Sequence, residues 1–228
     1  MSTTGAETGE SARLRRKLEL VLPLLVAEGR RLWEHPRIRE LYPEYLIATH
    51  GVIRASIPLM ERALERAQAV AADDPAAAGL AAYLEHHVDE ERGHDDWLLE
   101  DLEVLGRTPE AVLSRVPSAS VAALVGAQYY WIEHYHPVAL LGYIGLLEGY
   151  PPAIGDVDAL MARSGYEREA FRTLIRHSEL DPLHAADFDE AVDRLPLTPG
   201  QSAVVGLSGL HSVTAFTRVI QDVIAQAE

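Results

Sequence analysis

Apolar residues recur every three or four positions along most of the chain, which is the pattern of helices with one buried face. Between Ser11 and Leu25, leucine and valine follow this spacing, and basic side chains fill several of the positions between them. β-Branched residues keep the same helical spacing and do not alternate with polar ones, so no strand is predicted. The pattern predicts an all-α protein.

Proline, glycine and capping residues divide this pattern into about seven helices. Thr198, Pro199 and Gln201 have the sequence of a capping box, and Asp74 before Pro75 is typical of a helix N-cap. Residues 1–10 are small and polar, and we expect a frayed tail there, followed by a single domain over residues 11–228. The expected elements are a helix from Ser11, a loop over 35–43, helices over 44–71, 75–105, 118–149, 167–194 and 198–227, and short helices after Thr108 and over 156–164.

Length and charge limit the partners of this domain. The 228 residues are enough for a substantial core. Acidic side chains outnumber basic ones by 35 to 20, and the net charge of −15 disfavours binding to nucleic acid or anionic membranes. No apolar run approaches the roughly 20 residues of a membrane-spanning helix, and the N-terminus lacks the order of a secretory signal. We expect a cytoplasmic protein; a homodimer would be common for a helical enzyme of this size.

The chain contains no cysteine, which excludes disulfides, a thiol nucleophile and iron–sulfur clusters. Any metal must therefore be held by histidine and carboxylate side chains, a combination that suits iron, manganese or zinc. Two triplets of these residues share the spacing i, i+4, i+7, which places each triplet within about 60° of one helix face. The triplets are His87, Glu91 and His94, and His177, Asp181 and His184.

Each triplet contains an acid-x-x-His pair, and two such pairs on different helices form the core of di-iron carboxylate sites in helical bundles. These sites need carboxylates from other helices. Glu148 is the candidate, because it follows ten uncharged residues and would be costly to ionise there without a compensating cation. One triplet alone would be typical of a solvated helix face, whereas two triplets and Glu148 together favour metal binding. Pro182 predicts a kink or a less regular second triplet.

These motifs resemble those of the haem-oxygenase-like di-iron oxidases and oxygenases, often labelled iron-containing redox enzymes. The resemblance covers roughly residues 40–225 and implies a haem-oxygenase-like bundle with two iron ions per chain, although manganese suits the same ligands. It rests on His87-Val-Asp-Glu-Glu-Arg-Gly-His94, Gly142-Tyr-Ile-Gly-Leu-Leu-Glu148 and His177-Ser-Glu-Leu-Asp181-Pro-Leu-His184. The implied metal ligands are Glu91, His94, Glu148, His177, Asp181 and His184, with His87 and Glu90 as further candidates.

The same resemblance implies that the protein activates O2 and oxidises a small substrate, in specialised biosynthesis. Amino-acid-like and fatty-acid-like substrates are expected, with N-oxygenation, or C–H abstraction followed by C–C cleavage, as outcomes. Aromatic and histidine side chains ahead of Glu148 would line the substrate pocket, and we single out Trp131, His134 and Tyr143.

Three alternatives remain open from the sequence. A ferritin-like bundle also uses two acid-x-x-His pairs, but it would require two further glutamates on separate helices. A metal-free enzyme of the haem-oxygenase-like fold, similar to thiaminases or to cofactorless quinone synthases, would lack the full ligand set. A non-catalytic acidic binding protein would have histidines that titrate like free imidazole.

Overall fold

The computed structural model describes residues 9–227, apart from the side chains of residues 181–183. Every regular element in this part of the chain is helical, which confirms the all-α prediction. The first elements are α1 (Glu10–Leu18), α2 (Leu22–Trp33), α3 (Ile38–Ile53), α4 (Ser56–Val70), α5 (Pro75–Glu91), α6 (His94–Val104) and α7 (Pro109–Leu113). They are followed by α8 (Ala119–His134), the 3-10 helix η1 (Pro137–Ala139), α9 (Leu140–Leu147), α10 (Ile154–Ser164), η2 (Arg168–Phe171), α11 (Arg172–Arg194) and α12 (Pro199–Ala225).

The helices are shorter and more numerous than the sequence pattern predicts. The helix expected over residues 75–105 ends at Glu91 and restarts at His94, because Gly93 adopts a left-handed conformation with φ of 89°. The prediction of a loop over residues 35–43 is wrong, since α3 begins at Ile38 and continues through Pro43. Burial of the apolar side chains around this proline outweighs the one hydrogen bond that it cannot donate.

The helix expected over residues 44–71 is divided between α3 and α4, and the helix expected over 118–149 is divided among α8, η1 and α9. The predicted tail falls mostly on residues 1–8, which lie outside the described residues, and it does not reach residue 10, because α1 begins there. Helix α11 is continuous from Arg172 to Arg194, although Pro182 falls within it. The His177 and His184 positions therefore lie on one helix, as the spacing of the second triplet predicts.

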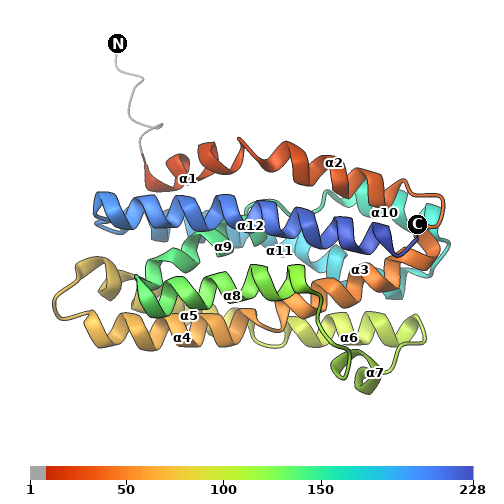
Figure 1. The fold of residues 1–228 in the computed structure, drawn as a ribbon, viewed down its shortest axis with the longest axis horizontal. Coiled ribbons are helices and arrows are strands. Elements are labelled where there is room, and N and C mark those ends of the chain that lie inside the picture. The colour runs from red at the N-terminus through yellow and green to blue at the C-terminus, as the bar shows by residue number, and fades with distance from the viewer. Residues whose placement is uncertain (1–8, 228) are drawn as a thin grey trace, which may run out of the picture.

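The long helix α12 connects two apolar cores. It runs lengthwise between α1 and α2 on one side and α8 and α9 on the other (Figure 1). Val205 and Val213 belong to the first core, whereas Ile220 and Val223 belong to the second. By length and composition α12 could cross a membrane, but 56% of its most apolar window is buried inside the protein, so packing against other helices accounts for its composition.

Helices α9 and α12 touch backbone to backbone. A Cβ atom added at Gly142 would lie 2.3 Å from the carbonyl oxygen of Val205 and 2.4 Å from the amide nitrogen of Gly209. Only glycine allows this approach, because the two clashing atoms belong to the main chain and cannot rotate away. This contact fixes α9, which carries Glu148 at its C-terminal end.

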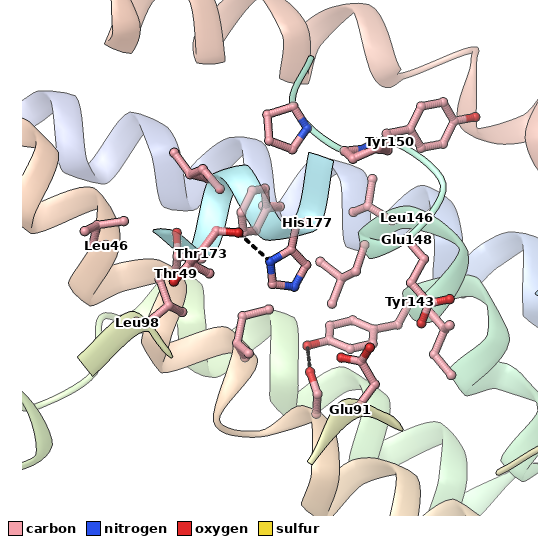
Figure 2. Close-up of a pocket in the computed structure, with 18 of the residues that line it drawn as sticks. Leu46, Thr49, Glu91, Leu98, Tyr143, Leu146, Glu148, Tyr150, Thr173 and His177 are labelled. Carbon is pink, nitrogen blue, oxygen red and sulfur yellow. Dashed lines mark hydrogen bonds between the residues drawn. The ribbon is translucent and has the colours of Figure 1, made fainter. Parts of the chain in front are cut away.

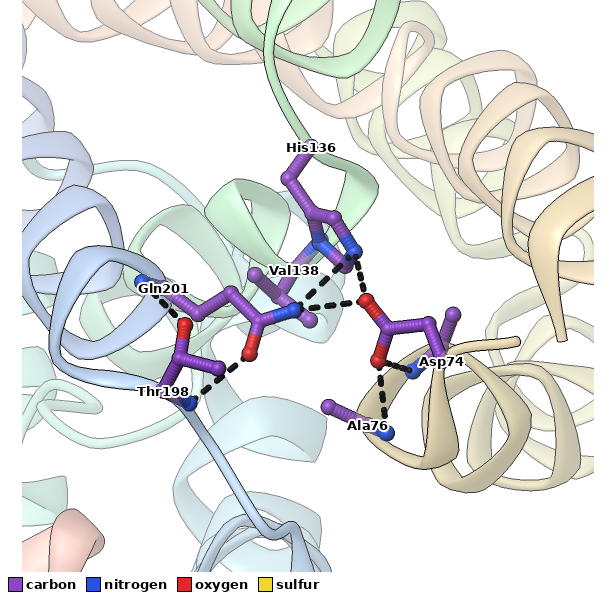
Figure 3. Close-up of polar contacts among 7 residues, drawn as sticks. Asp74, Ala76, His136, Val138, Thr198 and Gln201 are labelled. Carbon is purple, nitrogen blue, oxygen red and sulfur yellow. Dashed lines mark hydrogen bonds and ion pairs between the residues drawn. The ribbon is translucent and has the colours of Figure 1, made fainter.

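One polar junction joins the starts of three helical elements (Figure 3). One oxygen of Asp74 accepts hydrogen bonds from the backbone amides of Ala76 and Ala77 at the start of α5. The other oxygen accepts from Nε2 of His136 at 2.9 Å and from Nε2 of Gln201 at 2.7 Å. His136 caps η1, and Gln201 completes the capping box of α12. Burial alone would raise the pKa of Asp74, but its hydrogen bonds to Ala77, His136 and Ala76 hold the pKa below 3.8.

We predict that Asp74→Ala lowers the free energy of unfolding by about 2 kcal/mol, since it removes a helix cap and leaves the buried Gln201 and the partly buried His136 without their acceptor. Because the pKa of Asp74 is lowered in the folded state, this stabilisation is present above pH 3.8 and is lost as the pH falls further. Urea unfolding at several pH values measures both effects. The neighbouring Asp73→Ala is the matched control and should change stability by less than about 0.5 kcal/mol.

A second prediction tests the close contact of α9 with α12. Gly142→Ala should destabilise the fold by about 2 kcal/mol or more, because the new methyl group meets main-chain atoms. Gly126→Ala, in α8, is the control, since its added Cβ meets no atom within 4 Å. That control should stabilise the protein by about 0.5 to 1 kcal/mol, because alanine favours the helix. Equal effects of both substitutions on thermal unfolding would contradict the packing described here.

Candidate metal centre

Side chains from four helices converge on one buried cluster. The last turn of α5 supplies His87 and Glu91, and the first residue of α6 supplies His94. Glu148 comes from the C-terminal end of α9, and His177 and His184 come from α11. Figure 2 shows Glu91, Glu148 and His177 around the adjoining cavity. The structure thus brings together the sequence-predicted ligands whose side chains it describes; the side chain of Asp181 lies outside the described residues.

The contacts within the cluster centre on the two glutamates. Nε2 of His87 lies 2.6 Å from Oε1 of Glu148. The two oxygens of Glu91 face different histidines: Oε2 lies 3.0 Å from Nδ1 of His94, and Oε1 lies 3.5 Å from Nδ1 of His184. One ligand atom from each of His87, Glu91 and Glu148 falls within 4.8 Å of the others, a spacing that suits a shared metal ion.

Ring contacts complete the cluster. The imidazoles of His94 and His177 lie edge to face with ring centres 5.3 Å apart, and those of His87 and His184 lie edge to face at 6.2 Å. The break at Gly93 makes this arrangement differ from the single helix stripe that the first triplet predicts. His94 nevertheless contacts Glu91, because the chain turns at Gly93 and begins α6 immediately.

Burial and neighbouring charges shift the ionisation of the cluster in opposite directions. Burial raises the pKa of Glu148 above its ordinary value. Burial would also raise the pKa of Glu91, but the neighbouring imidazoles of His94, His87 and His177 lower it. Burial would lower the pKa of His87, but the carboxylate of Glu148 raises it. In His177, burial prevails and lowers the pKa, so its imidazole stays neutral.

A hydrogen bond to the main chain selects the tautomer of His177. Its Nδ1 lies 2.9 Å from the carbonyl oxygen of Thr173, which can only accept, so Nδ1 carries the proton (Figure 2). Nε2 therefore keeps its lone pair, as in metal-binding histidines that are oriented by a backbone carbonyl. The amide of Thr173 donates in turn to the fully buried carboxylate of Asp101, which fixes the start of α11.

The donor set fits a metal ion. Among the described residues, three buried polar atoms of the cluster form no hydrogen bond: Oε2 of Glu148, Nδ1 of His94 and Nδ1 of His184. The two imidazole nitrogens lie near the oxygens of Glu91 but without hydrogen-bond geometry. Unpaired polar atoms are costly in a protein interior, and here they are carboxylate and imidazole atoms, the ligand types that iron and manganese accept. Metal ions bound within the cluster would give these atoms partners and would offset the buried negative charge of Glu148.

The structure also places the remaining predicted residues. Glu90 is exposed, and its oxygens face His86 at 3.1 Å and His87 at 3.6 Å on the outside of the cluster. Tyr143 lines the adjoining cavity. Trp131 and His134 are not among the described lining residues: Trp131 contacts the ring of His211, and His134 is exposed beside Tyr130. Helix α8 ends at His134, so these two side chains precede the turn that leads to the cluster.

The adjoining cavity has a volume of about 170 Å³ and is largely apolar (Figure 2). His87, Glu91, Glu148 and His177 form part of its wall, and the described lining contains no arginine or lysine. The hydroxyl of Tyr143 is held by Ser56 at 3.2 Å and by the carbonyl oxygen of Val52 at 3.4 Å. Its apolar lining includes Leu25, Leu46, Ile53, Met60, Leu98, Ile144, Leu146, Leu147, Leu174 and Phe216.

Sequence reasoning missed several side chains that support the cluster. The ring of Trp97 stacks on His94 at 4.0 Å, and the ring of Tyr83 stacks on His87 at 5.0 Å. Both aromatic residues stand three or four positions from the histidine they contact. Because this spacing places two side chains on the same helix face, it could have predicted both ring contacts from the sequence.

The fold is haem-oxygenase-like, as solved structures show. The chain is similar to a domain of unknown function with that fold from Shewanella denitrificans (TM-score 0.78, 21% identity, 94% of this chain and 92% of that one). It is also similar to a TenA homologue from Pseudomonas syringae (TM-score 0.70, 12% identity, 99% of this chain and 99% of that one). A third similar structure is a CADD-like protein of unknown function from Nostoc punctiforme (TM-score 0.63, 16% identity, 94% of this chain and 98% of that one).

Residues 60–206 match the iron-containing redox enzyme family, and the chain belongs to that family. The matched segment includes every residue of the cluster. No curated protein matches the chain. The resemblance inferred from the motifs is thereby confirmed, both for the fold and for the family.

The contacts of His87 and Glu90 lead to a prediction about which of them supports metal binding. His87→Gln should weaken the affinity for ferrous iron by about tenfold or more, because it removes the imidazole that contacts Glu148. Glu90→Gln should change the affinity less than about threefold, since its carboxylate faces outward. Anaerobic equilibrium dialysis measures both values. A larger loss in the Glu90 variant would contradict the arrangement described here.

Proposed function

We propose that this protein is a non-haem di-iron oxidase or oxygenase that uses O2 to oxidise a small organic substrate. One observation carries the proposal: carboxylates and imidazoles, three of whose buried atoms form no hydrogen bond, converge beside a largely apolar cavity. Membership of an iron-containing redox enzyme family supports the same chemistry. When bound, the iron ions would supply the activation of O2.

The side chains divide into two groups around Glu91, which supports a pair of ions. His94 and His177 lie on the side of Oε2, so this group would hold one ion. His184 lies on the side of Oε1, and it contacts His87, whose partner is Glu148; this group would hold the other. Glu91, whose two oxygens face the two groups, would contribute its carboxylate to holding both ions. Asp181 would complete the set, as the family resemblance implies.

The cavity would bind the substrate beside these ligands and exclude water from the reaction. Its described lining has no arginine or lysine, so the part of the substrate that it holds is apolar and uncharged. Amino-acid-like and fatty-acid-like molecules meet this condition if their charged group lies at the metal end or outside the cavity. N-oxygenation, or C–H abstraction with C–C cleavage, is the reaction class that we propose.

We predict that the full-length protein, loaded anaerobically with ferrous iron, binds two equivalents per chain and shows a transient visible absorbance band on exposure to O2. His184→Ala should lose one equivalent, because it removes a nitrogen that faces Glu91. His211→Ala is the control, since His211 is also partly buried but contacts Trp131 and lies outside the cluster. Metal analysis after gel filtration gives the stoichiometry.

Two results would overturn parts of this proposal. Two retained iron equivalents in the His184 variant, or loss of iron in the His211 variant, would show that the assigned ligands are wrong. Absence of stoichiometric metal in the wild-type protein after iron loading would favour a metal-free enzyme of the same fold or a non-catalytic binding protein.

A further inference from the structure

Two threonine hydroxyls in the wall of the apolar cavity form no hydrogen bond. Thr49 comes from α3 and Thr173 from the first turn of α11, and both line the cavity. The Oγ1 atom of each is buried without a partner among the described residues, and Thr173 as a whole is only 4% exposed. Buried hydroxyls are usually hydrogen-bonded, because an unpaired one is unfavourable. A molecule bound in the cavity can supply the missing partner.

We infer that Thr49 and Thr173 form a subsite for an uncharged hydrogen-bonding group of the substrate, either a hydroxyl or an amide. The substrate class is then a mainly aliphatic molecule that carries such a neutral group at a distance from the position that is oxidised. The inference rests on the proposed function and deepens it, because it names the kind of molecule that the cavity holds beside the metal centre.

The threonine subsite lies close to the metal centre but apart from Glu148. Figure 2 shows Thr49 and Thr173 on one side of His177, and Glu148 and Tyr143 on the other. The carbonyl oxygen of Thr173 accepts the hydrogen bond from Nδ1 of His177, so the two residues are one helical turn apart, roughly 5 Å along α11. A substrate held by the threonines therefore extends its aliphatic part past His177.

The charges around the cavity favour a neutral group at this subsite. The described lining contains no arginine or lysine, so a carboxylate beside the threonines would lose its water without gaining a cation. Its only described carboxylates are Glu91 and Glu148, which belong to the metal cluster, so no lining carboxylate compensates an ammonium group there either. A hydroxyl or amide is less costly to bury, and each threonine hydroxyl can both donate to it and accept from it.

Neighbouring polar groups do not occupy these hydroxyls. Burial raises the pKa of Tyr45 and of Asp101, and the nearby Thr49 and Thr173 oppose this rise. Neither threonine hydroxyl has hydrogen-bond geometry toward these neighbours. The hydroxyl of Tyr150, another lining residue, also forms no hydrogen bond, but it points away from the cavity (Figure 2). The two threonines thus remain available to a ligand.

The test measures binding of three six-carbon probes to the full-length, iron-free protein by isothermal titration calorimetry at pH 7.5. The probes are 1-hexanol, hexanoate and 1-chlorohexane, which share a chain and differ in its end group. Thr49→Val and Thr173→Val keep the shape of the side chain and remove its hydroxyl. Each should weaken 1-hexanol binding by about tenfold and change 1-chlorohexane binding by less than about twofold, because only the alcohol loses a hydrogen bond. Hexanoate should bind the wild-type protein more weakly than 1-hexanol does.

The matched control is Thr217→Val. Thr217 is also buried, but its hydroxyl donates to the carbonyl oxygen of Val213 at 2.7 Å, and it is not among the described lining residues. This control should lower Tm, because it removes a formed hydrogen bond, and should leave 1-hexanol binding unchanged. Thr49→Val and Thr173→Val should leave Tm the same or raise it. Weaker binding without a lower Tm is a pattern that damage to the fold would not produce.

Three results would overturn the inference: no 1-hexanol binding to the wild-type protein, unchanged 1-hexanol affinity in both valine variants, or equal losses for 1-hexanol and 1-chlorohexane. Tighter binding of hexanoate that depends on the threonines would assign an anion to the subsite and would also overturn it. These outcomes leave the proposed function standing, because iron binding is measured separately. A wild-type protein that binds 1-hexanol through the threonines but takes up no iron would instead remove the proposed function.

Discussion

The structure depends on keeping two carboxylates inside a helical protein. Glu148 follows the apolar helix α9, and Glu91 ends α5. An ionised carboxylate at either position would be strongly unfavourable if it faced only aliphatic neighbours. Histidines from α5, α6 and α11 surround them, and two of the three buried histidines of the described chain, His87 and His94, belong to this cluster. The metal-binding chemistry that we propose follows from this constraint, because a cation satisfies carboxylates and neutral imidazoles together.

Much of the site could be predicted from the sequence. The spacing of the histidine and acid residues identifies the correct side chains even though α5 and α6 are separate helices, because contacts between Glu91 and His94 survive the turn at Gly93. The position of Glu148 could be predicted because a lone charge after an apolar helix needs a compensating partner. Neither argument uses the exact ends of the helices.

Other features could not be predicted because they depend on tertiary contacts. The continuation of α3 through Pro43 depends on burial of its apolar face, which local sequence rules do not measure. The distinction between His87 and Glu90 depends on which of two adjacent regions of α5 faces α9. Trp131 and His134 lie in α8, which ends before the turn, so their closeness to Glu148 in sequence does not bring them to the cavity.

The glycine contact between α9 and α12 has a mechanical consequence. Where side chains separate two helices, rotamer changes can accommodate small displacements. A main-chain contact has no side chain that could move in this way. A shift of α12 along its axis must therefore carry α9 and its terminal carboxylate with it. Because the C-terminal part of α12 is embedded in the second core, the position of Glu148 is tied to packing in that core as well.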